Sequence, residues 1–217
     1  EYRKELIHRK WQLENISDEN EKNEILKKTN VDKGKRRGPG LDENVNVKIV
    51  DMGNACWFHH HFSTEIQTRQ YRGPEVLLGS KYNLTADMWS LACMTFEMLT
   101  GELLFNPRKD NNDSFGKNDD HLAQMMELLG RFPRKFTCRG TKARKYFSKE
   151  GNLNRIPKLQ NWSLKDVMIA KYRFTEEQAL FFEDFMSPML NCYPERRLLA
   201  DQMLSHPWLY TKSPEIG

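Results

Sequence analysis

The segment from Thr85 to Gly101 is the feature that most restricts the fold of this chain. Thr85 is a suitable N-cap and Gly101 a suitable C-terminal residue, so the stretch between them predicts a helix. Apolar side chains surround this helix: Met88, Trp89, Leu91, Ala92, Met94, Phe96, Met98 and Leu99. A helix that is apolar all round must be covered by other elements. We therefore expect it to form the centre of a core.

Two further segments predict helices. In residues 120–129, apolar residues recur at helical spacing: Leu122, Met125, Met126 and Leu129. The opposite face is expected to be exposed to solvent and carries Asp120, Gln124 and Glu127. Farther along, Thr175 and Gln178 make a capping box, which opens a helix that is expected to continue through Leu190.

Shorter elements are expected elsewhere in the chain. We predict a strand at 47–51 and short helices at 143–147, 164–171 and 199–204. The stretch from the strand to about residue 75 is irregular, 106–118 is a polar loop, and 131–172 is rich in loops. Residues 47–217 are therefore expected to form one mainly helical domain.

Residues 1–46 differ from the rest of the chain because they are highly charged and contain few apolar residues. We expect a helix at 2–13 followed by a flexible linker. The basic run Lys33-Gly34-Lys35-Arg36-Arg37 is interpreted either as a solvated part of this linker or as a nuclear-import signal. The sequence leaves both interpretations open.

The overall composition limits the classes of partner. The chain has 217 residues, and its 34 basic and 30 acidic residues give a net charge of +4, which is too balanced to indicate direct binding of nucleic acid. No apolar run is long enough to span a membrane, and no signal peptide is recognisable. The four cysteines are far apart, and the run His59-His60-His61 has no partner with ligand spacing, so we expect no zinc site. We expect a monomer that acts in the cytoplasm and nucleus.

Asp51 is the candidate metal ligand. It ends the predicted strand and precedes Met52-Gly53, which places a carboxylate close to a flexible glycine. Such a carboxylate suits Mg²⁺ when the ion also binds ATP phosphates. A D-x-G match alone is common, so its weight depends on the motifs that follow.

The motif from Gln67 to Glu75 is the most specific one. Its pattern, T-R-x-Y-R-x-P-E, resembles the substrate-binding end of the activation segment in the CMGC group of protein kinases. The resemblance implies that Thr68 hydrogen-bonds the catalytic loop. It also implies that Tyr71 and Arg72 shape the pocket for the residue that follows the phosphorylated one.

The same resemblance implies structural roles for three more residues. Glu75 would form a buried ion pair with an arginine of Pro194-Glu195-Arg196-Arg197, and the family spacing favours Arg197. Asp87, near the start of the predicted central helix, would accept hydrogen bonds from the catalytic-loop backbone. Its alternative role is to cap the helix.

Longer stretches resemble SR-protein kinases, which phosphorylate serines in Arg-Ser repeats of proteins that act in mRNA splicing. These stretches are 48–57, 67–72, 120–123 and 128–135, and the resemblance covers residues 47–210. It implies a bilobal α+β kinase fold, of which this chain is the mainly α-helical C-terminal lobe. It also implies ATP and Mg²⁺ as cofactors and Arg-Ser-rich proteins as partners. The N-terminal lobe and the catalytic base are expected upstream of Glu1.

That family binds arginine-rich substrates in an acidic groove of the large lobe. By resemblance, the groove positions are Glu102, Asp120, Glu127 and Lys171. Helical spacing agrees, because it places Asp120 and Glu127 on one face two turns apart; an ordinary solvated helix face is the alternative. Arg69 and Arg72, with Lys117, have a second implied role, which is to hold a phosphoserine already made.

Two other functions stay open at this stage. One is a kinase-derived scaffold that binds basic peptides without phosphoryl transfer, and the other is a CMGC kinase of different specificity. The short segment between Asp51 and Glu75 also predicts that the complete enzyme is active without an upstream activating kinase, because Gln67 and Thr68 are expected to pin it.

Overall fold

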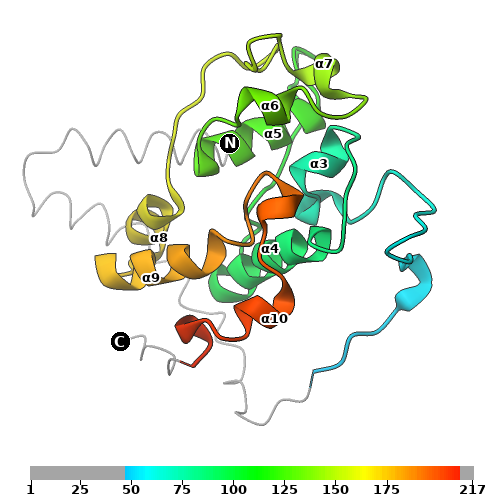
Figure 1. The fold of residues 1–217 in the computed structure, drawn as a ribbon. Helices are drawn as coiled ribbons and strands as arrows, with labels where there is room; N and C mark the ends of the chain where they lie inside the picture. Colours follow the sequence, from blue (N-terminus) through cyan, green and yellow to red (C-terminus); the bar gives the residue numbers. More distant parts are fainter. Residues whose placement is uncertain (1–46, 211–217) are drawn as a thin grey trace, which may run out of the picture. The chain divides into compact units, whose positions relative to one another are not determined.

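A computed structural model describes residues 47–210 of the chain (Figure 1). The chain divides into two compact units, Glu1–Ala55 and Cys56–Gly217, and each is described by itself. The helix and linker predicted within 1–46 lie outside the described residues. No helix within 47–210 combines the length and apolar composition that a membrane span requires.

The described part of the first unit is a short extended segment. The strand predicted at 47–51 is wrong: Val47–Val50 have no regular structure, and Val47 and Ile49 are 85% and 84% exposed. A strand needs a neighbouring strand for its backbone hydrogen bonds, and no strand forms anywhere in 47–210. A 3₁₀ helix, η1 (Met52–Asn54), follows Asp51.

The second unit is built on helix α4 (Ala86–Thr100), which ends at Gly101 in a left-handed conformation as predicted. Trp89, Ala92 and Phe96 are buried along it, and Phe96 meets Tyr172 edge to face. The expected burial on all sides is wrong, because one face is exposed among the described residues: Leu91, Met94, Met98 and Leu99. The fold class is nevertheless confirmed as a mainly helical kinase lobe.

Thr85 precedes α4 without capping it through its side chain. Its hydroxyl lies 2.6 Å from Asn83 Oδ1 and 2.9 Å from the Pro194 carbonyl oxygen, to either of which it can donate. Asn83 Oδ1 also accepts from the Thr85 amide. The start of α4 is therefore fixed to a distant segment, which a local capping rule does not predict.

Helix α5 (Lys117–Leu129) begins three residues before the predicted start. Leu122, Met125 and Met126 are buried, as their spacing predicts. The short helix α3 (Pro74–Leu77), which was not predicted, packs against α5. Pro74 is its first residue, where a missing amide hydrogen costs no helical bond.

Helices α8 (Leu164–Tyr172) and α9 (Glu176–Met186) lie side by side (Figure 1). The predicted capping box opens α9, with the Gln178 amide donating to Thr175 Oγ1 at 3.2 Å. The helix ends four residues before Leu190 because Pro188 has no amide hydrogen to continue it. Helix α10 (Ala200–Met203) and the 3₁₀ helix η4 (Pro207–Tyr210) complete the unit, and η4 packs on α9.

The stretch 131–172 also holds two short helices, the predicted α7 (Ala143–Tyr146) and the unexpected α6 (Arg134–Thr137). Gly140, between them, has a φ of +84° and lies against the end of α3. The amides of Thr141 and Lys142 donate to the carbonyl oxygens of Gly79 and Leu78. This contact fixes the segment to the rest of the second unit.

Candidate functional site

Asp51 adopts a backbone conformation that is uncommon for a residue with a side chain. Its φ and ψ are both 62°, and its side chain is exposed. Aspartate tolerates the left-handed region better than most residues, and strained residues concentrate at functional sites. A lone exposed carboxylate fits Mg²⁺, which keeps several waters and binds phosphate oxygens together with one or two carboxylates. Asp51 would hold the ion, and this role of Asp51 as a metal ligand stays a prediction.

Gln67 holds the second unit's candidate substrate segment. Its φ of 69° is also left-handed. Its Nε2 donates to the Ala86 carbonyl oxygen (2.6 Å) and to Ser90 Oγ (2.8 Å), and its Oε1 accepts from the Gly73 amide at 3.2 Å. One side chain therefore ties both ends of the motif to α4. Sequence reasoning gave Gln67 no site role beyond pinning, although its place at the start of the motif was the available signal.

Thr68 begins the 3₁₀ helix η2 (Arg69–Tyr71) in an extended conformation. It is exposed, and its hydroxyl makes no hydrogen bond within residues 47–210. Its predicted bond to a catalytic loop stays a prediction.

Tyr71 is fixed to the central helix. Its hydroxyl donates to Glu97 Oε2 at 2.6 Å, and this hydrogen bond raises the pKa of Tyr71. Ser90 Oγ donates to the Tyr71 carbonyl oxygen at 2.9 Å. These two hydrogen bonds fix Tyr71 against α4, and its role in shaping a substrate pocket stays a prediction.

Arg69 and Arg72 donate hydrogen bonds to neutral oxygen acceptors. Arg72 donates to the carbonyl oxygens of Ile66 and Gln67, both at 3.0 Å, and Arg69 donates to Asn118 Oδ1 at 2.5 Å. Neither forms an ion pair with a carboxylate of residues 47–210. Burial, and then the charge of Arg69, lower the pKa of Arg72. The two guanidinium groups therefore make a positive site that could receive an anion.

Glu75 and Arg197 form the ion pair that the motif predicts. Arg197 Nη1 and Nη2 donate to the two Glu75 oxygens at 2.7 and 2.6 Å, and both side chains are fully buried. Arg197 Nε also donates to the Asn191 carbonyl oxygen, and its guanidinium lies 5.0 Å from the centre of the Trp89 ring. The neighbouring Arg196 is exposed. The pair therefore joins the motif, α4 and the segment before α10.

Asp87 lies in the first turn of α4 and is exposed. Its carboxylate has no hydrogen-bond donor within residues 47–210, and desolvation by the surrounding protein raises its pKa. A carboxylate in this position can accept hydrogen bonds from a segment that docks on α4. Its role with a catalytic loop stays a prediction.

The four predicted docking residues lie in two different settings. Glu102 and Lys171 form an ion pair, and Tyr172 Oη lies 3.3 Å from Glu102 Oε2. Glu127 is partly exposed and accepts from the Gln160 amide at 3.1 Å. The predicted solvent exposure of Asp120 is wrong, because the residue is only 4% exposed.

The burial of Asp120 has a clear cause. Its Oδ2 accepts from the Arg108 amide at 2.9 Å and from Gln124 Nε2 at 2.7 Å. Gln124 in turn exchanges hydrogen bonds with the backbone of Asn106. The loop before α5 therefore folds over the polar face, because its backbone groups need partners. Helical spacing cannot predict this, since it does not say where a loop goes.

Comparisons with known proteins show that the chain belongs to the protein kinase family. The model of the protein kinase domain matches residues 40–209. The serine/threonine-protein kinase SRPK of Physarum polycephalum is 52% identical over 77% of this chain and 39% of its own length. Protein kinase dsk1 of Schizosaccharomyces pombe is 48% identical over 76% of the chain, and SRSF protein kinase 3 of Mus musculus is 45% identical over 79%. Each of the latter two is covered over 30% of its length, so the chain spans well under half of these relatives.

Proposed function

We propose that the whole protein transfers the γ-phosphoryl group of ATP to serines of Arg-Ser-rich proteins. The chain belongs to the protein kinase family and, within it, to the SR-protein kinases. In this reaction the serine oxygen forms a bond to the γ-phosphorus while the bond from that phosphorus to the ADP oxygen breaks. The hydroxyl proton goes to a catalytic base that residues 47–210 do not supply. Bound Mg²⁺ would neutralise charge on the phosphates.

The single observation that carries the proposal is the way residues 67–75 are held. Gln67 and Tyr71 are bonded to α4, and Glu75 is locked to Arg197, so the motif has a fixed shape without a phosphate. Preorganised positioning is the main contribution of a kinase to phosphoryl transfer. This geometry also supports activity without an upstream kinase.

We assign the acidic docking role to Glu102 and Glu127. Each is partly exposed, so each could contact a guanidinium group of an Arg-Ser substrate. Lys171 would orient Glu102 through their ion pair. Buried Asp120 would act indirectly, by fixing the loop that borders α5. This division of roles explains why two kinds of acid are present on one helix.

The proposal extends to the biological setting. Transfer to Arg-Ser-rich proteins would regulate mRNA splicing factors, and it would take place in the cytoplasm and nucleus. Arg69 and Arg72 would hold a phosphoserine that the enzyme has already made, because their charges lack carboxylate partners within 47–210.

The test is phosphoryl transfer by the complete kinase to an Arg-Ser repeat peptide and to a proline-directed peptide. We expect transfer to the Arg-Ser peptide to be strongly preferred, and Asp51→Asn to abolish it. A protein that binds the peptide but transfers no phosphate would be a scaffold, and preference for the proline-directed peptide would indicate a different CMGC specificity. Loss of activity on phosphatase treatment would contradict activity without an upstream kinase.

A further inference from the structure

Residues 131–158, here called the basic segment, have a large excess of positive over negative charge. They contain ten basic residues and one acidic residue, a net charge of +9. Since the whole chain has a net charge of +4, the remaining residues carry −5. The balanced total therefore hides a strongly polar distribution of charge, and a local excess of this size attracts anions.

The basic segment is a folded surface and not a flexible tail. Its four aromatic side chains, Phe132, Phe136, Tyr146 and Phe147, are all buried. Gly140 fixes it to α3 through the backbone contacts described above. Its cations are therefore presented at fixed positions.

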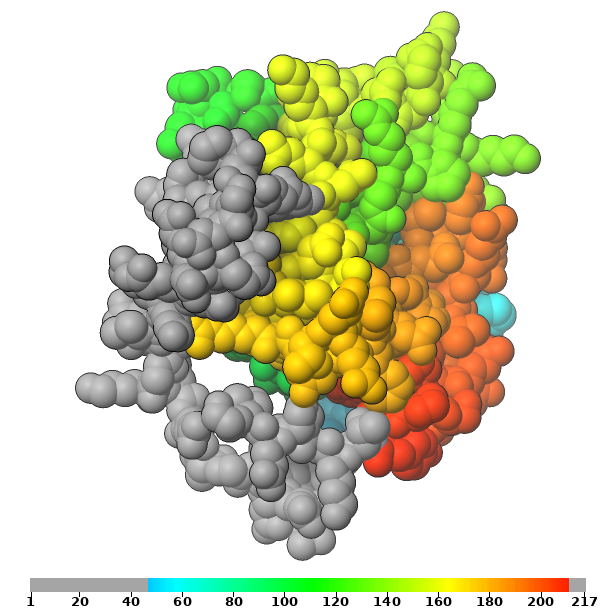
Figure 2. Space-filling view, turned by 90° about the vertical axis from the view of Figure 1, so that its left-hand side faces the viewer, coloured from blue at the N-terminus to red at the C-terminus, as the bar shows by residue number. Residues whose placement is uncertain are grey.

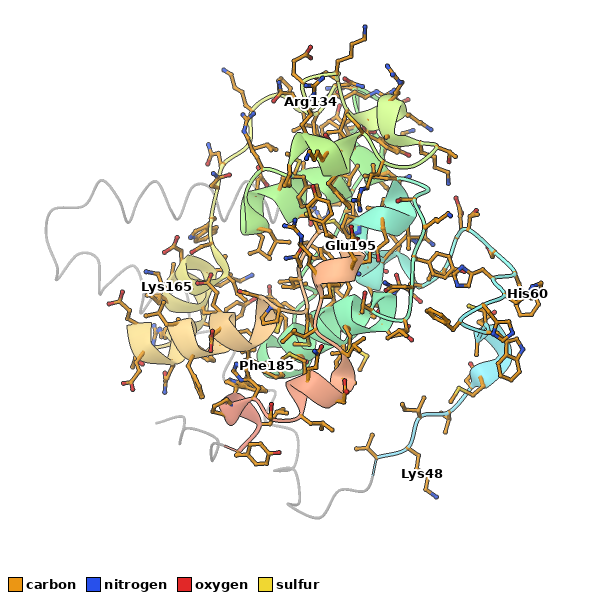
Figure 3. All side chains as sticks on the ribbon, viewed as in Figure 1. Lys48, His60, Arg134, Lys165, Phe185 and Glu195 are labelled. Atoms are coloured by element: carbon orange, nitrogen blue, oxygen red, sulfur yellow. The ribbon has the colours of Figure 1, made fainter. Side chains whose placement is uncertain are left out.

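At least half of these ten cations are exposed and have no carboxylate partner within residues 47–210. Three have carboxylate partners: Arg139 with Glu195, Lys142 with Glu65 and Arg155 with Asp119. Five others are exposed and form no ion pair with any residue in 47–210: Lys135, Arg144, Lys145, Lys149 and Lys158. Long side chains of this segment project into solvent (Figure 2), and around Arg134 many of them end in nitrogen (Figure 3).

A hollow of about 390 Å³ connects the basic segment to the substrate motif. Arg69 of the motif, Lys117 of α5, and Lys145 and Arg155 of the basic segment all line it. A chain of hydrogen bonds spans it, from Arg69 to Asn118 Oδ1 and from Asn118 Nδ2 to the Tyr146 hydroxyl at 2.8 Å. The substrate motif at 67–75 and the basic segment thus both border this hollow.

The two acids that line the hollow are already occupied. Asp119 is 4% exposed; it accepts from the Gly116 amide and pairs with Arg155 at 3.0 Å. Asp113 pairs with Lys109. The remaining cations, Arg69, Lys117 and Lys145, therefore give the hollow a net positive charge.

We propose that the basic segment, through Arg144 and Lys145, binds the phosphorylated part of an Arg-Ser substrate as it leaves the motif through this hollow. The inference rests on the proposed function, and it adds residues beyond Arg69, Arg72 and Lys117. Phosphoserine carries nearly two negative charges and strong acceptor oxygens, which fit exposed arginine and lysine side chains. An unphosphorylated Arg-Ser segment is positive and would be repelled.

A peptide suits this surface better than nucleic acid does. Proteins that bind single-stranded nucleic acid stack bases on aromatic side chains, and every aromatic ring of the basic segment is buried. The surface also begins at the motif where the phosphoserine is made, which gives the product a short path to it.

The test measures peptide binding to the complete kinase by fluorescence anisotropy. The probes are an Arg-Ser repeat peptide, the same peptide phosphorylated on every serine, and oligouridylate. The test variant is Arg144→Gln/Lys145→Gln, and the matched control is Arg139→Gln/Lys142→Gln, which removes the same charge from cations that already have carboxylate partners. Thermal denaturation of both variants is the check that each one folds.

We expect the test variant to bind the phosphopeptide about tenfold more weakly, and the control to change by less than about twofold. Equal losses in the two variants, no loss in the test variant, or a loss confined to oligouridylate would each overturn the inference. Failure of the unphosphorylated peptide to bind the wild-type chain would count against the proposed docking role alone, because the comparison of phosphopeptide affinities does not use it.

Discussion

The substrate motif at 67–75 and the polar face of α5 were both predicted to be functional. The structure agrees with the contact predicted for the motif but not with the exposure predicted for α5. In the motif, Glu75 meets the distant Arg197, as its pattern indicates. On α5, the expected exposed acid Asp120 is buried under a loop. A motif with a known partner carries information about tertiary contacts, whereas helical periodicity describes one element only. If the contrast is real, substitutions at the long-range contacts should lower the free energy of unfolding more than substitutions at exposed positions.

The largest effect is expected at the buried ion pair. Arg197→Ala should lower the free energy of unfolding by about 3–5 kcal/mol, because it leaves Glu75 charged and unpaired in the core. Urea denaturation measures this change. The matched control, Arg196→Ala, removes an exposed guanidinium one residue away and should cost less than about 1 kcal/mol. Equal effects would mean that the pair does not lock the motif.

A somewhat smaller effect is expected where the basic segment meets α3. Gly140→Ala places a Cβ 2.3 Å from the Leu78 carbonyl oxygen, at a φ of +84°, so the backbone must shift. We expect a loss of about 3 kcal/mol in the free energy of unfolding. Gly130→Ala is the control, since its φ is +85° but no atom lies within 4 Å of the added Cβ. It should cost about 1–2 kcal/mol from the backbone conformation alone. A similar loss in both variants would show that steric contact is unimportant.

The buried face of α5 should make stability depend on pH. His121 is fully buried, and neither ring nitrogen has a partner within 47–210. Burial, and then Arg69 and Arg72, lower the pKa of His121 to about 3. Between that value and about 6.5 the unfolded chain binds a proton that the folded chain does not, so stability falls as the pH falls below about 6.5.

The expected size is about 2 kcal/mol at about pH 5. Urea denaturation at several pH values measures it, and His121→Phe should remove this part of the slope. The control His61→Phe removes an exposed imidazole and should keep the slope. An unchanged slope in His121→Phe would contradict the burial of a neutral His121.

The smallest of these effects is expected at Asp120. Asp120→Ala leaves the Arg108 amide without its acceptor and should cost about 1–2 kcal/mol in the free energy of unfolding. Glu127→Ala, on the same helix, should cost less because Glu127 is partly exposed. The reverse order would mean that Asp120 faces solvent, as spacing alone predicted.

The sequence was sufficient for elements whose signals are local. Gly101 ends α4 and the box of Thr175 and Gln178 opens α9, because caps depend on residues next to the helix. It was insufficient where distant segments decide. The absence of a strand at 47–51, the fold of the loop over Asp120 and the exposed face of α4 each depend on what lies beside the element.

The candidate site divides in the same way. The motif and the family resemblance indicated Glu75 and Arg197 as a pair, and the structure brings them together. The link from Arg69 through Asn118 to Tyr146 could not be predicted, because it joins three segments by single hydrogen bonds. The charge of the basic segment can be counted from the sequence, but the balanced net charge of the whole chain does not reveal it.

The most direct test of the account compares kcat/KM of the complete kinase for Arg-Ser and proline-directed peptides, in the wild type and in Glu102→Lys/Glu127→Lys. The account predicts that the wild type prefers the Arg-Ser peptide and that charge reversal lowers kcat/KM for that peptide about tenfold or more, with little change for the other. An unchanged preference in the variant would contradict acidic docking on this lobe, and its absence in the wild type would contradict the proposed specificity.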